Sequence, residues 1–390
     1  MINFGIVDND NAQQVYYLLK SIKKNCKFDY TITLIECSKN NPIKNVIDGV
    51  KKYTCKYEDA NKILREKITE NLCILNPNIL IKKDFRIEDV SEPFIFGENC
   101  YFLPKTDETE EYKKTLDLPV EIWDGESNYI DWLYKHEHDW KFYYEDFIVS
   151  MTTWHKRIHD NATYEALESF VNQKCDYNYK VMIVLAEEEF GKEVPVRMKD
   201  FVESHKDKVE ILWTYKDTRP LKKLDPTMEK YPECPIVTLD DDDILDENDL
   251  QKLYIQHMED PWSVYGSMID NCYGIEHFDY VCKWVANCRI WPPHCLYNFP
   301  LSDFYEYFGG ILDDNFNAVR CLYKMTPVKE IKNIQSHKKN DSEIKLTYEY
   351  ADTDWPNLYS NFIMQHLEEL PSDLLYEWYS LFRKSEWNSS

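Results

Sequence analysis

From residue 147 onward, continuous apolar runs alternate with segments in which the apolar residues recur at helical intervals. Four short runs predict strands, at residues 147–153, 180–186, 209–214 and 235–239. The run KVMIVLA is apolar throughout, as expected for a strand buried on both faces. The intervening segments predict helices, at residues 160–173, 194–205, 221–230 and 246–258. The order β-α-β-α-β-α-β predicts a parallel sheet with helices on its faces.

The first 146 residues predict a separate and smaller α/β domain. The run at 1–7 predicts a strand, the spacing at 13–22 a helix, and the run at 30–37 a second strand. The charged stretch 104–117 predicts an exposed loop, so the two domains connect at or after it. We therefore expect three parts, at residues 1–146, 147–370 and 371–390.

Two segments of the chain share one pattern. Residues 71–85 (NLCILNPNILIKKDF) and 235–250 (PIVTLDDDDILDENDL) each have an apolar run, a short polar turn and further apolar residues. One interpretation is an internal duplication, in which Asn76-Pro77-Asn78 stands where the second segment has its aspartates. This copy would be inactive, since Asn and Pro do not replace carboxylates as metal ligands. The other interpretation is two unrelated β-turn-α units.

Four consecutive aspartates, Asp240 to Asp243, follow the strand predicted at 235–239. Ligands of open α/β sheets bind at the carboxyl ends of the strands. Four adjacent carboxylates cannot all stay ionised in one small site without a compensating charge. A hard cation, Mn²⁺ or Mg²⁺, supplies that charge and takes oxygen ligands. An EF-hand does not fit, because Ile244 and Leu245 fill its fifth and sixth positions. A solvated acidic loop remains the alternative.

Five stretches, in this order, carry a resemblance to a known enzyme group: VSMTTWHKRI (149–158), SFVNQK (169–174), PLKKLDPTMEKYPECPIVTLDDDD (220–243), FGGIL (308–312) and ADTDW (351–355). The acidic run resembles the D-x-D motif of GT-A-fold glycosyltransferases. Together the five resemble bacterial family 2-type enzymes that build surface polysaccharides. The resemblance spans residues 147 to 370.

This resemblance implies a GT-A (Rossmann-like), mostly parallel sheet flanked by helices. The smaller preceding α/β domain would be a non-catalytic, degenerate GT-A relative. The implied activity is metal-dependent transfer of a sugar from a nucleotide-sugar donor to a hydroxyl of a glycan or lipid-linked glycan acceptor. UDP is the favoured nucleotide, and inversion the favoured stereochemistry. The alternative function is a catalytically inactive glycan- or nucleotide-binding module with a divalent-cation site.

The resemblance also implies roles for the aspartates. Asp240 and Asp242 would hold the metal, which binds the donor diphosphate. Asp241 would reach the ribose or the nucleobase. With four aspartates in a row, the metal ligands could instead be Asp241 and Asp243.

Other residues of these motifs would bind the donor. Thr152 and Thr153, at the end of the first strand, would line the base pocket. Arg157 and either Lys222 or Lys223 would offset phosphate charge. A plain surface charge is the alternative for each basic residue.

An inverting transfer needs a general base that takes the acceptor proton. In the family an acidic residue late in the domain does this, so Asp354 is the first candidate and Asp352 the second. Thr353 separates the two, unlike the adjacent acid pair of the family. Asp313 and Asp314, after the glycine pair, are the competing choice. A helix cap or an exposed loop residue is the alternative for each acid.

Charge and cysteine usage restrict the partners and the compartment. The net charge of −24 argues against a nucleic-acid partner, which needs a basic surface. The N-terminus has no secretory pattern, no apolar stretch is long enough for a membrane span, and the twelve cysteines contain no C-x-x-C. We therefore expect a cytoplasmic protein. The segment 372–384 has amphipathic helical spacing, which favours packing on the catalytic domain over peripheral membrane contact.

Overall fold

The computed structural model describes part of the chain in detail. Asp352, Asp354 and most of the expected C-terminal helix lie outside that part, so their predicted roles stay predictions. The described residues are 1–40, 42–68, 71–82, 85–87, 93–96, 100–103, 146–271, 283–310, 312–334, 337–338 and 361–372, with shorter pieces between 118 and 133 and at 374–375.

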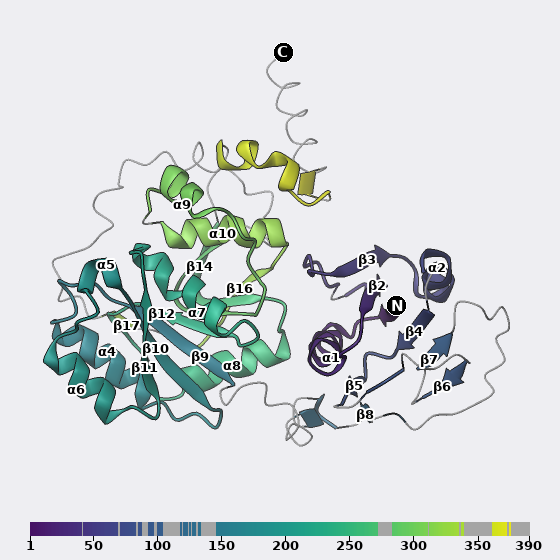
Figure 1. Ribbon diagram of the computed structural model, residues 1–390, viewed down its shortest axis with the longest axis horizontal. Coiled ribbons are helices and arrows are strands. Elements are labelled where there is room, and N and C mark those ends of the chain that lie inside the picture. The colour runs from purple at the N-terminus through teal and green to yellow at the C-terminus, as the bar shows by residue number, and fades with distance from the viewer. Residues whose placement is uncertain are drawn as a thin grey trace, which may run out of the picture. The chain divides into compact units, whose positions relative to one another are not determined.

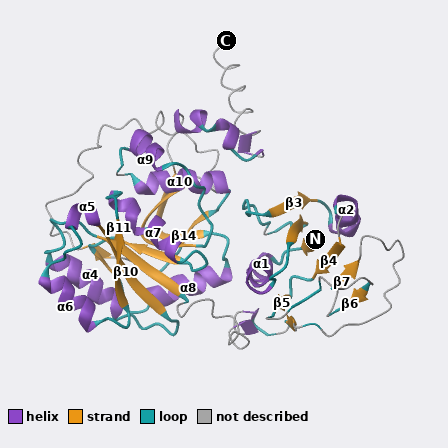
Figure 2. Cartoon of the chain, in the orientation of Figure 1, coloured by secondary structure: helices purple, strands orange, loops and turns teal. Residues whose placement is uncertain are grey.

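The chain forms two compact units (Figure 1). The first comprises Met1–Lys141 with Met258–Pro261, and the second Phe142–His257 with Trp262–Ser390. Each contains strands and helices, as Figure 2 shows by colour. The expected limits of the catalytic domain, at 147 and 370, stay predictions.

The second unit is built on a seven-stranded sheet in the order β11-β10-β9-β12-β15-β14-β16. Only β15 runs against its neighbours, so the sheet is mostly parallel, and the α/β prediction is confirmed. The sequence did not predict the hairpin of β14 and β15. The strands are β9 (Phe147–Thr152), β10 (Tyr179–Ala186), β11 (Val209–Thr214), β12 (Ile236–Leu239), β14 (Val264–Asn271), β15 (Lys283–Trp291) and β16 (Val328–Glu330).

Helices flank this sheet, as predicted (Figure 1). Tyr164 and Leu167 of α4 are buried, and Tyr164 meets Phe201 of α6 with ring centroids 6.3 Å apart. No helix that the structure describes is long and apolar enough to span a bilayer. Helices whose full extent is described are α4 (Asn161–Val171), α5 (Glu187–Phe190), α6 (Val196–Ser204), α7 (Asp225–Lys230), α8 (Asp249–Glu259), α9 (Leu301–Phe308) and α10 (Asp313–Lys324), with 3-10 turns η3 (Arg219–Lys223) and η6 (Leu367–Glu369).

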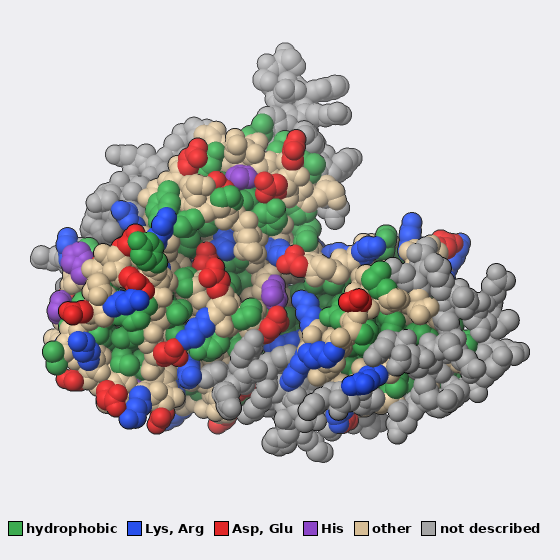
Figure 3. Space-filling model, viewed as in Figure 1, with side chains coloured by type: hydrophobic (Ala, Val, Ile, Leu, Met, Phe, Trp, Pro, Cys, Tyr) green, Lys and Arg blue, Asp and Glu red, His purple; other side chains and the backbone are tan. Residues whose placement is uncertain are grey.

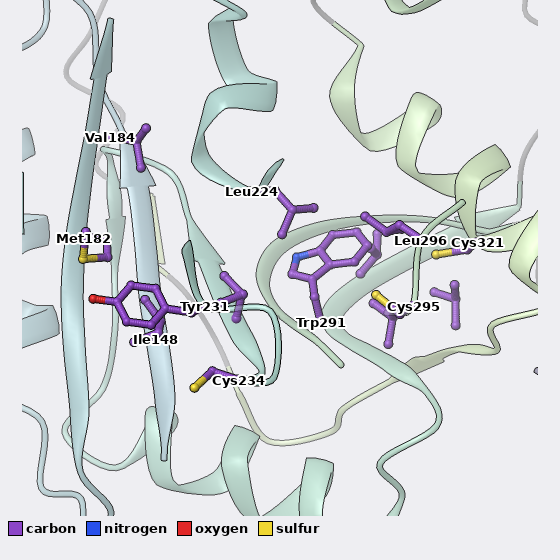
Figure 4. Close-up of a cluster of buried hydrophobic side chains, with 14 residues drawn as sticks. Ile148, Met182, Val184, Leu224, Tyr231, Cys234, Trp291, Cys295, Leu296 and Cys321 are labelled. Carbon is purple, nitrogen blue, oxygen red and sulfur yellow. The ribbon is translucent and has the colours of Figure 1, made fainter. Parts of the chain in front are cut away.

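A buried apolar cluster fixes the central strands of this sheet (Figure 4). Ile148 of β9 and Met182 of β10 belong to it, as does Trp291 of β15. The Trp291 indole N–H donates to Thr238 Oγ1 of β12 at 2.7 Å, so its polar atom is satisfied within the core. The carboxyl ends of β9 and β12 are thereby held on a packed base.

The first unit has a six-stranded sheet in the order β3-β2-β1-β4-β7-β6. Strands β1 to β4 are parallel, and β7 and β6 follow as antiparallel neighbours. The strands are β1 (Ile2–Asp8), β2 (Tyr30–Glu36), β3 (Val50–Thr54), β4 (Asn71–Leu75), β6 (Phe94–Ile95) and β7 (Tyr101–Leu103). Helices of this unit whose full extent is described are α1 (Ala12–Asn25) and α2 (Ala60–Lys67), with a 3-10 turn η1 (Tyr57–Asp59).

The two sheets share one strand order. In each, the first four strands are parallel and lie in the order third, second, first, fourth. The fourth strand then pairs with an antiparallel strand. After the fourth strand a short strand pairs with a later one, β5 (Ile79–Ile81) with β8 (Val120–Ile122), and β13 (Asp243–Ile244) with β17 (His337–Lys338).

The turn after the fourth strand also matches. The Ile79 N–H donates to Asn76 O at 3.2 Å, and the Asp243 N–H donates to Asp240 O at 3.2 Å. Asn76 therefore takes the turn position that Asp240 takes in the second unit. These features favour the duplication over two unrelated β-turn-α units.

Two acidic side chains are buried side by side in the first unit. Asp8 and Glu36 are register partners at the ends of β1 and β2. Asp8 accepts hydrogen bonds from Asn11 N at 2.7 Å and Ser38 Oγ at 2.9 Å. Burial, and then the Glu36 charge, raise the pKa of Asp8 to about 6 in spite of these bonds.

We expect Asp8→Asn to stabilise the protein near neutral pH. Well below pH 3.8 the Asp8 carboxyl is protonated in both the folded and the unfolded chain. As the pH rises to about 6, the unfolded chain ionises first, so the wild type loses stability that the variant keeps. Calorimetric Tm values should show a larger gain at about pH 8 than at about pH 3.5. An equal gain at both, or the same profile for the exposed control Asp29→Asn, would contradict this cause.

Candidate active site

The four aspartates lie at the carboxyl end of β12, between β9 and β15. Leu239 pairs with Met151 on one side, and Thr238 pairs with Arg289 on the other. The sheet register therefore brings Thr153 to one side of the acidic run and Arg289 to the other. This is the edge of the sheet at which the sequence predicted a ligand site.

Asp240 is paired with a buried lysine. Lys223 Nζ lies 2.7 Å from Asp240 Oδ1 and 3.3 Å from Asp313 Oδ2. Ser150 of β9 donates a hydrogen bond to the Lys223 carbonyl, which ties the backbone of η3 to the sheet. Burial and Arg289 lower the pKa of Lys223, but the carboxylates, Asp240 first, outweigh them and raise it. Lys223 is therefore a fixed cation between two acids.

Asp241 and Asp242 share one arginine. Arg157 Nη1 lies 2.8 Å from Asp241 Oδ1, and Arg157 Nη2 lies 2.7 Å from Asp242 Oδ2. Thr153 Oγ1 donates to Asp241 Oδ2 at 2.6 Å. Burial raises the pKa of Asp241 to about 6, against the opposing effects of Arg157 and Thr153. Asp241 is thus a buried anchor for the loop.

Asp240, Asp242 and Asp243 form a group that could hold a metal ion. One carboxylate oxygen from each lies within 4.8 Å of the others. Asp243 is fully buried, and its Oδ2 accepts the backbone N–H of Asp240 at 2.9 Å. Within the described part of the chain no other group of three metal-ligating side chains converges in this way. An all-oxygen donor set fits a hard divalent cation.

A second ion pair lies behind Asp240. Arg289 of β15 is 1% exposed and contacts Asp314 through Nη1, and its Nη2 lies 3.8 Å from Asp240 Oδ1. Burial raises the pKa of Asp314 to about 6, and Arg289 opposes that rise. Arg289 itself has its pKa raised, because its acidic neighbours, Asp314 first, outweigh its burial.

A glycine pair positions the acids of α10. Gly309 and Gly310 have φ of 61° and 68°, in the left-handed region that favours glycine. A Cβ on Gly310 would lie 2.6 Å from the Tyr305 ring. This tight turn from α9 places Asp313 and Asp314 in the first turn of α10. The backbone of Gly309 and Gly310 therefore supports the site.

The site holds more acid than base. Its six carboxylates are those of residues 240–243, 313 and 314, and its three cations are Arg157, Lys223 and Arg289. A bound dication would offset most of the difference. Acidic and basic side chains are interspersed over the visible face of the second unit (Figure 3).

The other predicted donor residues lie nearby with different partners. Lys222 is buried, with Nζ 2.7 Å from Asp217 Oδ1 and 3.6 Å from Glu189 Oε2. Thr152 Oγ1 donates to Val184 O at 2.7 Å, across to β10. Of the two lysines that the sequence left open, Lys223 is the one that contacts the acidic run.

Sequence reasoning missed Arg289. A signal was present, because an arginine inside the apolar run of VANCRIW predicts a buried ion pair if that run is a strand. The strand itself was not predicted, so the arginine was not noticed.

Comparisons with known proteins give structural likeness alone. No protein-family profile and no curated protein sequence matches the chain. The structure of S. aureus TarS 1-349 is 14% identical with a TM-score of 0.34, over 49% of this chain and 59% of that one. The mannosyltransferase PcManGT from Pyrobaculum calidifontis, in complex with GDP-Man and Mn²⁺, is 15% identical with a TM-score of 0.33, over 49% and 56%. The UTP-bound UGPase from Acinetobacter baumannii is 8% identical with a TM-score of 0.31, over 60% and 98%.

The match therefore spans less than two thirds of the TarS and mannosyltransferase structures. The function is inferred below from the site itself.

Proposed function

We propose that the second unit is a metal-dependent glycosyltransferase. It transfers a sugar from a nucleotide-sugar donor, with UDP the favoured nucleotide, to a hydroxyl of a glycan or lipid-linked glycan acceptor, as in surface polysaccharide synthesis. The observation that carries the proposal is the group of Asp240, Asp242 and Asp243 at the carboxyl end of a central parallel strand. The D-x-D resemblance of the same residues supports it.

The residues of the site divide the work. Asp240, Asp242 and Asp243 would hold Mn²⁺ or Mg²⁺. When bound, the cation stabilises negative charge on the departing diphosphate. Thr153 and Arg157 keep Asp241 in place, on the side where the nucleoside would bind.

Asp313 is our choice of general base among the described acids. Its carboxylate shares Lys223 with Asp240, so it lies beside the proposed metal ligand. Asp314 is held by the buried Arg289 and remains the competing base of this pair, since its pKa is raised to about 6. A single base that acts on the acceptor hydroxyl predicts inversion at the anomeric centre. Asp354 and Asp352 remain candidates from the sequence.

The first unit would be a degenerate copy without its own metal site. Its strand order matches that of the second unit, and Asn76 takes the turn position of Asp240. We therefore expect one donor site per chain.

Calorimetric titration with UDP, and with GDP for comparison, tests the proposal with and without Mn²⁺. We expect UDP to bind with a stoichiometry of one, only with metal, and not to bind Asp240→Asn/Asp242→Asn. The exposed pair Asp200→Asn/Asp207→Asn makes the same charge change and should bind as wild type does.

If no nucleotide binds with metal present, or if the site variant still binds, the donor-site assignment is wrong. If the nucleotide binds but neither sugar transfer nor donor hydrolysis is detected, the protein is an inactive binding module and not an enzyme.

A further inference from the structure

Arg157 competes with the proposed cation for one carboxylate. Its Nη2 lies 2.7 Å from Asp242 Oδ2, and Asp242 is one of the three acids that could hold the metal. Two positive charges in contact with one carboxylate repel each other. The ion pair between Arg157 and Asp242 therefore weakens binding of a cation by all three aspartates, and a bound cation weakens the ion pair.

The arginine is anchored at its other end. The Arg157 carbonyl accepts hydrogen bonds from Asp160 N and Thr163 Oγ1, both at 2.9 Å, so the start of α4 fixes its backbone. Its Nη1 pairs with Asp241, which also accepts from Thr153.

The two acids differ in exposure. The Asp241 side chain is 6% exposed and that of Asp242 is 19% exposed. Asp242 is therefore the more accessible of the two partners, and it also belongs to the group that could hold the cation.

We propose that Arg157 is a charge switch that couples metal binding to donor binding. Without metal, the guanidinium holds Asp242 and lowers the charge of the acidic loop. When a divalent cation takes Asp242, Nη1 stays on Asp241 and Nη2 becomes available to a phosphate oxygen of the donor. The inference rests on the proposed function, because it assumes the cation and a nucleotide diphosphate.

The planar fork of arginine suits this task. Its two terminal nitrogens contact two acids at once, so one contact can be exchanged while the other holds. A lysine carries a single ammonium nitrogen, so it has no second nitrogen that could be released while the first stays on Asp241. Coupling of this kind is reciprocal, so metal should tighten UDP binding by the factor by which UDP tightens metal binding.

The test measures Mn²⁺ binding in the full chain, by calorimetry or by the electron paramagnetic resonance of free Mn²⁺, with and without UDP. We expect Arg157→Gln to bind Mn²⁺ alone about tenfold more tightly than wild type, since the competing charge is gone. We expect the tightening of Mn²⁺ binding by UDP to fall by about tenfold, since the phosphate contact is gone too.

Two further variants make the result interpretable. Arg157→Lys keeps a positive charge beside the buried Asp241. It should also bind Mn²⁺ alone more tightly than wild type. This variant keeps the test possible if Arg157→Gln fails to fold. Arg197→Gln removes an exposed arginine whose Nη1 contacts Asn161 Oδ1 at 2.9 Å, and should leave both quantities unchanged.

Three outcomes would overturn an assignment. Equal Mn²⁺ affinity in wild type and in both Arg157 variants rejects the switch and leaves the glycosyltransferase proposal intact. An equal shift in Arg197→Gln assigns the effect to overall charge and also rejects the switch. If wild type binds no Mn²⁺ with or without UDP, both proposals are wrong.

Discussion

Arg289→Met is expected to lower the free energy of unfolding by about 1.5–3 kcal/mol. The Arg289 side chain is 1% exposed and contacts Asp314, and its Nη2 lies 3.8 Å from Asp240 Oδ1. Methionine fills much of the same volume but leaves the Asp314 carboxylate, whose side chain is 30% exposed, without its cation. Urea unfolding, followed by circular dichroism at about pH 8, where Asp314 is ionised, measures the loss.

A paired substitution separates charge from packing. Arg289→Met/Asp314→Asn removes both charges, so it should be more stable than Arg289→Met alone. The exposed control Arg86→Met should stay within about 0.5 kcal/mol of wild type. A single variant as stable as wild type would show that Asp314 does not depend on Arg289.

Asp313→Asn is expected to lower the turnover number for sugar transfer by about 10²–10⁴-fold. The amide cannot take the acceptor proton, but it keeps the size and most of the hydrogen-bonding capacity of the carboxyl. Lys223 retains Asp240 at 2.7 Å, so metal-dependent UDP binding should change little. Steady-state transfer assays and UDP titration on the same preparation give the two quantities.

The neighbouring acid supplies the control. Asp314→Asn leaves the buried Arg289 without its main partner, so we expect lost stability rather than a selective loss of turnover. If Asp313→Asn keeps its turnover while Asp354→Asn loses it, the base is Asp354.

The sequence determined the elements with the strongest local signals. The apolar run of β10 predicted its strand, because a strand buried on both faces needs apolar residues throughout. The spacing of Tyr164 and Leu167 predicted α4, because apolar residues three positions apart lie on the same face of a helix and are buried together. The position of the aspartates could then be inferred, because the carboxyl ends of parallel strands all lie at one edge of the sheet.

The hairpin of β14 and β15 was not predicted, because polar and aromatic residues interrupt both strands. The shared strand order of the two units also required the structure. Strand order depends on which strands pair, and such pairing joins residues far apart in the chain.

Only the tertiary structure decided the partners of the charged residues. Lys222 and Lys223 are neighbours in sequence and indistinguishable by type, but successive side chains of a 3-10 turn point about 120° apart. Lys222 therefore meets Asp217, and Lys223 meets Asp240. Arg289 reaches the acidic run because β15 pairs with β12, a contact between residues about fifty positions apart. Local sequence patterns do not identify the partners in such ion pairs, because the two residues are separated in sequence and meet only in the folded chain.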